Sequence, residues 1–135
     1  MPRDELSRCY LGIGISSRAV YRDALTLAGR LLGDAGIAAS ALDGIATIDI
    51  RRDHPVIIEL ARHLGVGLSC YPAIELEALT PRLIHPSEAT YLRIGCHGVA
   101  EASALAASGK GGCLLVGKTI SGGVTMALAR GAAVP

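Results

Sequence analysis

The sequence contains no tryptophan and no phenylalanine, and only four tyrosines. Proteins that stack nucleic-acid bases need aromatic side chains beside a basic stripe. The chain offers neither, because 13 basic residues are balanced by 12 acidic ones and the formal net charge is +1. We therefore expect no nucleic-acid partner, and we expect a core built from aliphatic side chains.

Long apolar runs are also missing. No stretch reaches the roughly 18–20 apolar residues that a membrane span requires. The charged start of the chain, MPRDELSR, leads only into a short apolar run over residues 10–15. This pattern lacks the longer apolar region and the cleavage site of a signal peptide. We expect no membrane association, and the cytoplasm is the expected location.

Clustered metal or redox ligands are absent as well. The four cysteines occur singly, no pair has Cys-x-x-Cys spacing, and the four histidines show no metal-ligand spacing. The sequence therefore predicts no metal site and no cofactor, and the cysteines are expected to be small core residues.

Half of the residues are apolar and the mean hydropathy is +0.43. A chain of 135 residues with this composition fits one domain, residues 1–135, whose ends (1–8 and 131–135) we expect to be flexible. The oligomeric state is not indicated.

Apolar and β-branched runs alternate with segments of helical spacing. Strands are predicted at 9–15, 45–50, 68–71, 113–118 and 124–130, and helices at 20–32, 56–64 and 99–108, with shorter helical pieces at 74–79 and 87–92. Ser16 or Ser17 is expected to cap the first helix, and Ser87 is expected to cap the piece that follows it. A five-residue turn over 119–123 joins the last two strands, which are therefore antiparallel. We predict a three-layer α/β/α domain with a mixed, mostly parallel sheet of about five strands that ends in an antiparallel hairpin.

Ligands of open α/β sheets bind at the carboxyl ends of the parallel strands, and this rule selects three loops. In the first loop, the candidate binding residues are Gly12, Gly14, Ser16 and Arg18. Small residues there let backbone N–H groups and a helix N-terminus approach an anion. A tight packing turn without a ligand explains the same residues equally well.

The second loop contains Thr47, Asp49 and Arg51. Asp49 is a candidate acid or base, and Arg51 could hold a carboxylate through two hydrogen bonds. An Asp49 that caps a helix, and arginines that are simply solvated, are equally compatible with this loop.

In the third loop, Lys118, Ser121, Gly122 and Thr125 are candidates for holding an anion, although hairpins often contain lysine and glycine for structural reasons. Ser87 is added as a further binding candidate. The residues by themselves predict an anion-binding α/β domain.

Six short motifs in fixed order make the prediction more specific. They are G-I-G at 12–14, A-T-I-D-I at 46–50, P-S-E-A at 86–89, G-V-A-E-A at 98–102, L-L-V-x-K at 114–118 and G-G-V-T-x-A-x-A-R at 122–130. In this order they resemble the CobE / CbiG C-terminal domain family of cobalamin biosynthesis, over nearly the whole chain. One departure is that Ile15, Ser16 and Ser17 follow G-I-G, where the family usually has a cysteine and basic residues.

The resemblance implies a ligand of precorrin or hydrogenobyrinic acid type, a tetrapyrrole rich in carboxylates. It also implies that the longer CbiG proteins open a ring lactone of a cobalt-precorrin and release acetaldehyde. The length of this chain resembles the stand-alone CobE form of the oxygen-dependent route, which has no such step.

Three functions follow from the resemblance. The first is a protein that binds an intermediate and passes it on. The second is a hydrolase of a precorrin lactone, like cobalt-precorrin-5A hydrolase, with Asp49 or Glu101 as base. Glu101 also fits a purely structural role, because acidic residues stabilise the first turn of a helix. The third is a non-catalytic partner of other pathway enzymes.

Overall fold

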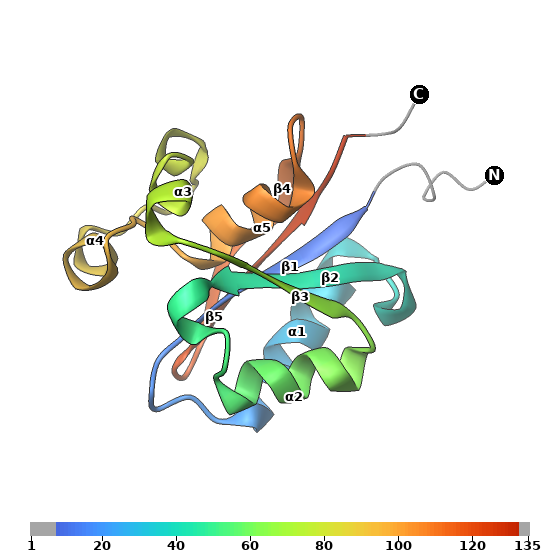
Figure 1. Ribbon diagram of the computed structural model, residues 1–135. Helices are drawn as coiled ribbons and strands as arrows, with labels where there is room; N and C mark the ends of the chain where they lie inside the picture. The colour runs from blue at the N-terminus through green and yellow to red at the C-terminus, as the bar shows by residue number, and fades with distance from the viewer. Residues whose placement is uncertain (1–7, 133–135) are drawn as a thin grey trace.

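The computed structural model describes residues 8–132, and its centre is an open sheet of five strands (Figure 1). The strands are β1 (Cys9–Ile15), β2 (Leu42–Ile48), β3 (Gly67–Tyr71), β4 (Cys113–Ser121) and β5 (Val124–Arg130). Their order in the sheet is β3-β2-β1-β5-β4. β1 pairs in parallel with β2, and β2 with β3, whereas β5 is antiparallel to both β1 and β4. The predicted mixed sheet with a terminal hairpin is confirmed.

Helices cover both faces of this sheet, which confirms the predicted three-layer fold (Figure 1). The helices are α1 (Tyr21–Ala35), α2 (Pro55–Leu64), α3 (Ala73–Glu77), α4 (Glu88–Ile94) and α5 (Ala100–Ser108), with 3₁₀ turns at Ala39–Ala41, Asp49–Arg51 and Thr80–Arg82. α1 and α2 pack together on one face, and α5 packs on the other against four or more strands with α3 beside it. α1 buries five residues at helical spacing, namely Ala24, Leu27, Ala28, Leu31 and Leu32. No helix in the described part of the chain is both long and apolar enough to cross a membrane.

α5 lies unusually close to β1 because small residues face each other across the contact. A Cβ atom on Gly12 would collide with the carbonyl oxygen of Ala100 and would lie 2.7 Å from the backbone nitrogen of Ala104. Ser103 fixes the same helix to β2 by donating a hydrogen bond to the Ala46 carbonyl at 3.2 Å. This packing brings the N-terminus of α5 to the carboxyl end of β1, where Gly14 lies next to Val99.

Four local predictions were wrong. Of the cysteines expected in the core, Cys113 is exposed and Cys70 is only partly buried. β2 ends at Ile48 instead of residue 50, because burial ends there: Ile48 is 1% exposed and Ile50 is 64% exposed. The β4–β5 turn has two residues instead of five, since strand pairing continues to Ser121 and Val124; Gly122, with a φ of 59°, then closes the turn. Neither Ser16 nor Ser17 caps α1, whose N-cap is Val20.

The cap predicted for α4 is confirmed, because the Ser87 hydroxyl accepts a hydrogen bond from the Thr90 N–H at 3.2 Å. At the ends of the described chain, the Gly131 N–H donates to the Arg8 carbonyl at 2.8 Å, and Ala132 follows. The remaining residues of the two ends that we expect to be flexible, 1–7 and 133–135, lie outside the described part.

Candidate ligand-binding site

A cavity of about 900 Å³ lies at the carboxyl ends of β1 and β2. Gly14 and Ile15 end β1 at its wall, Ile48 ends β2 there, and the β4–β5 turn adds Gly122 and Gly123. The chain runs from β1 outward to β2 and β3 and then returns to the other side of β1, so this edge is the point where strand order reverses. Open α/β sheets bind their ligands at such a point, and the volume is within the range of small-molecule sites.

Most of the site residues predicted from the sequence line this cavity. They are Gly14, Ser16, Arg18, Arg51, Glu101, Lys118, Gly122 and Thr125. All three predicted loops therefore meet in one place.

Five predicted residues lie outside the cavity lining. Gly12 provides close contact with α5, and the buried hydroxyl of Thr47 donates to the Ile13 carbonyl at 2.7 Å. Ser87 caps α4. Asp49 begins the 3₁₀ turn after β2, and Ser121 ends β4.

Four cationic side chains surround the cavity, and each comes from a different segment: Arg18 from the loop after β1, Arg51 from the turn after β2, Arg93 from α4 and Lys118 from β4. Asp23 and Glu101 are the acidic residues of the lining. Sequence reasoning missed Arg93. The signal was present, since Thr90, Arg93 and Ile94 have the i, i+3, i+4 spacing of one helix face, and all three line the cavity.

Two helix N-termini also open into this cavity without a side-chain cap. The N-cap residues of α1 and α5 are Val20 and Val99, and both line the cavity. Valine has no polar atom in its side chain, so it cannot satisfy the first N–H groups of either helix. The partial positive charge of both helix ends is therefore directed at the same space, which favours an anion there.

Glu101 is fixed by its surroundings. Its side chain is 2% exposed, and its carboxylate accepts backbone N–H groups from Ile84 (3.0 Å), His85 (2.9 Å) and Lys118 (2.8 Å). Burial alone would raise the pKa of Glu101, but these donors together with the His85 ring outweigh burial and hold the pKa below its usual value. Glu101 is thus an ionised hydrogen-bond acceptor that ties α5 to residues 84–85 and to β4.

The same carboxylate orients a histidine that sequence reasoning did not select. His85 Nδ1 lies 3.2 Å from Glu101 Oε2, and the His85 ring, 54% exposed, lines the cavity. No sequence signal joins the two residues, because they are 16 positions apart and meet only when residue 85 folds over α5.

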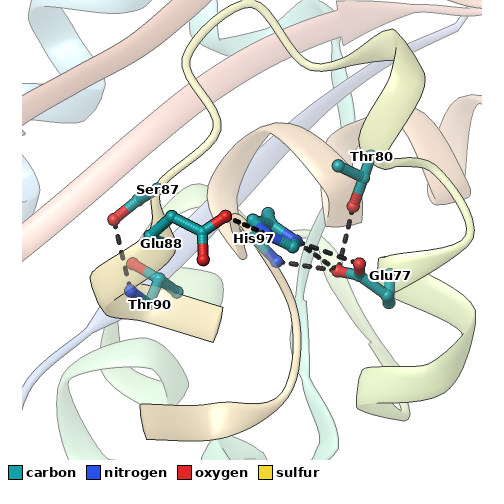
Figure 2. A network of polar contacts seen from close by, with 6 residues as sticks. All are labelled: Glu77, Thr80, Ser87, Glu88, Thr90 and His97. Carbon is teal, nitrogen blue, oxygen red and sulfur yellow. Dashed lines mark hydrogen bonds and ion pairs between the residues drawn. The ribbon is translucent and has the colours of Figure 1, made fainter. Parts of the chain in front are cut away.

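A second histidine holds the wall of the cavity in place (Figure 2). The ring of His97 lies between Glu77 of α3 and Glu88 of α4, with Nδ1 2.9 Å from Glu77 and Nε2 3.0 Å from Glu88. Tyr91 stacks on this ring with a centroid distance of 4.5 Å. The backbone carbonyl of His97 also accepts the Ser87 N–H at 2.7 Å. α4 has no buried residue; it is attached through His97 and through Ile94, which packs against buried apolar side chains.

The charges of this network are mutually stabilising. Hydrogen bonds to Glu77 and then to Glu88 raise the pKa of His97. The hydrogen bond from His97 in turn lowers the pKa of Glu77, to which Thr80 also donates at 2.9 Å. His97 is therefore an imidazolium bridge between two carboxylates over a wider pH range than an isolated histidine would allow.

A family model and a curated relative both place the chain in the same protein family. Residues 9–129 match the family described as "Cobalamin synthesis G C-terminus". The chain is 41% identical to Protein CobE of Sinorhizobium sp. over 119 residues, which cover 88% of this chain and 77% of that protein.

Solved structures agree. The crystal structure of CobE, a protein from the cobalamin biosynthetic pathway, is 33% identical and has a TM-score of 0.88, with coverage of 100% of this chain and 98% of that one. Cobalamin biosynthesis protein chiG from Agrobacterium tumefaciens is 26% identical with a TM-score of 0.69, over 90% of this chain and 96% of that one. The chain therefore belongs to the CbiG C-terminal family and is a protein of the cobalamin biosynthesis pathway.

Proposed function

We propose that the cavity binds a carboxylate-rich tetrapyrrole of precorrin or hydrogenobyrinic acid type, and that the protein passes this intermediate on within the pathway. The observation that carries the proposal is the set of four cations, Arg18, Arg51, Arg93 and Lys118, which surround one cavity from four separate segments. Dispersed cations match a ligand whose carboxylates are spread around a ring, whereas a single phosphate needs them close together.

The remaining lining supports the same ligand. The uncapped N-termini of α1 and α5 supply N–H donors for further carboxylates. Val20 and Ile94 supply apolar surface for the macrocycle. Neither of the carboxylates that we considered as a hydrolytic base supports lactone hydrolysis, since Asp49 is outside the lining and Glu101 is occupied by backbone donors. Binding is therefore the function that we favour.

The proposal is tested by titrating the purified protein with hydrogenobyrinic acid and following the absorbance of the tetrapyrrole. We expect a spectral change that saturates at a fixed ratio, with the compound recovered intact. Arg51→Ala or Lys118→Ala should each weaken binding tenfold or more, which corresponds to about 1.5–3 kcal/mol for a charged hydrogen bond. The matched control is Arg62→Ala on the exposed side of α2, whose affinity should not change. Equal affinity of all these variants would place the ligand elsewhere.

A role as partner of another pathway enzyme is a second candidate, and exposed apolar side chains favour it. Ile74 of α3 is 79% exposed, and Leu92 is 80% exposed on α4, the helix that contributes Thr90, Arg93 and Ile94 to the cavity lining. A receiving enzyme that docks there would lie next to the ligand. Leu92→Ser should then slow the transfer of bound hydrogenobyrinic acid to a purified pathway enzyme that uses this compound, without changing the affinity of the protein for it. An unchanged transfer rate would count against this role.

A further inference from the structure

The carboxylate of Glu101 contacts His85 at its ring and at its backbone N–H, and it also accepts the N–H of the preceding residue, Ile84. Glu101 Oε1 accepts the backbone N–H groups of Ile84 and His85, and Oε2 lies 3.2 Å from the ring nitrogen Nδ1. Because the same side chain fixes both the backbone and the ring, the imidazole has a defined orientation even though it is 54% exposed.

The state of Glu101 determines which ring nitrogen carries the proton. An ionised carboxylate can only accept hydrogen bonds, and the lowered pKa of Glu101 keeps it ionised. Nδ1 of neutral His85 must therefore be the N–H donor, which leaves Nε2 with a lone pair. Within residues 8–132, no partner bonds to Nε2, and the ring lines the cavity.

The neighbouring strand leaves space for this arrangement. A Cβ atom on Gly117 of β4 would lie 3.1 Å from Glu101 Oε2 and 3.3 Å from His85 Cε1. Both distances are tighter than ordinary van der Waals contact, so the absence of a side chain at position 117 lets the ring and the carboxylate meet beside β4.

We propose that His85 is the acid–base residue of the cavity, with Nε2 as proton acceptor toward the bound polycarboxylate compound and Glu101 as its positioning residue. In this step Nε2 takes one proton from an O–H or N–H group of the compound, and the N–H or O–H bond breaks as the new N–H bond forms. The imidazolium that forms keeps its Nδ1 3.2 Å from the Glu101 carboxylate. The proton returns to the compound before release, so no oxidant, reductant or cofactor is consumed. This inference rests on the proposed ligand but adds a residue and a chemical role to it.

The first test needs no ligand. Long-range ¹H–¹⁵N spectra of the ¹⁵N-labelled full chain report the tautomer of each histidine, with His85→Gln used for assignment. We expect His85 to show a protonated Nδ1 and an unprotonated Nε2 in its neutral form, and His97 to show both nitrogens protonated. An Nε2–H tautomer at His85 would overturn the proposal.

The second test adds hydrogenobyrinic acid to the same sample. We expect the Nε2 signal of His85 to move toward that of a protonated nitrogen on binding, while His63, exposed on α2, stays unchanged as an internal control. If the compound binds and His85 does not respond, the acid–base role is wrong and the binding function stands. If the compound does not bind at all, the proposed function fails, and this role fails with it.

Discussion

Two histidine–glutamate contacts lie within 25 residues of each other, and they are built in opposite ways. In the His85–Glu101 contact the carboxylate is buried and the ring is exposed, with exposed fractions of 2% and 54%. In the His97 network the ring is the more buried partner, at 17%, between Glu77 at 33% and Glu88 at 81%. The first contact leaves a ring nitrogen for the cavity, whereas the second uses both nitrogens to connect α3 and α4.

The difference shows that the immediate partners of a histidine, more than its distance from a cavity, determine what it can do. A fixed carboxylate on one nitrogen orients the ring for chemistry at the other. Carboxylates on both nitrogens favour the cationic ring and leave no nitrogen free to react. Substitutions in the two contacts should therefore differ in their effects on stability and on pH dependence.

Glu101→Ala should cause the largest loss of stability. It leaves three partly buried backbone N–H groups, those of Ile84, His85 and Lys118, without an acceptor. We expect a loss of about 3–5 kcal/mol in the free energy of unfolding, measured by urea denaturation. Glu88→Ala is the matched control, because the Glu88 carboxylate is 81% exposed. Equal losses for the two variants would contradict the distinction drawn here.

Gly117→Ala tests the space beside the buried pair. The added methyl group would lie too close to Glu101 Oε2 and to His85 Cε1, so we expect a loss of about 1–3 kcal/mol in the free energy of unfolding. The same substitution at Gly29, in the middle of α1, has no atom within 4 Å of the new Cβ. Gly29→Ala should therefore stabilise the protein by about 0.5–1 kcal/mol, because alanine favours a helix. A neutral Gly117→Ala would show that the ring and the carboxylate do not meet as described.

His97→Gln should change the pH dependence of stability. The raised pKa of His97 stabilises the folded state fully below about pH 6.5, and this contribution is lost as the pH rises through the raised value. The lowered pKa of Glu77 stabilises it above about pH 4.5, and this contribution is lost as the pH falls through the lowered value. The stability difference between wild type and variant should therefore be largest between these two values and shrink toward alkaline pH. His63→Gln is the control, and a difference that is constant from pH 5 to pH 9 would argue against the imidazolium bridge.

Glu88→Gln should have the smallest effect on unfolding, because ion pairs of a carboxylate that is 81% exposed contribute little to stability. Its effect should be local. We expect faster amide hydrogen exchange over residues 88–94, since α4 has no buried residue and loses one of its attachments. Exchange in α5 should be unchanged, and equal acceleration in both helices would indicate global destabilisation instead.

The sequence predicted the elements that have one clear environment. The buried run of β1, the periodic apolar face of α1 and the hairpin of β4 and β5 all follow from local patterns. The errors occur where burial or strand pairing determines the end of a strand. β2 ends before Ile50, which is exposed, and β4 continues to Ser121 because β5 supplies hydrogen-bond partners.

The site residues, too, could be predicted where local pattern and topology select them, and not where tertiary contacts do. Residues at strand ends, such as Arg18 and Arg51, could be selected because topology brings strand ends together. His85 and Arg93 were missed, because both lie in the least regular segment. Glu101 was selected, but its hydrogen bonds to residues 84, 85 and 118 are tertiary and have no signature along the chain.

The absorbance titration with hydrogenobyrinic acid decides whether this cavity is a polycarboxylate tetrapyrrole site. We predict saturable binding by the wild-type protein, at least tenfold weaker binding by Lys118→Ala and by Arg51→Ala, and unchanged binding by Arg62→Ala. Absence of a saturable spectral change, or equal affinity of all four proteins, would contradict the assignment of this cavity.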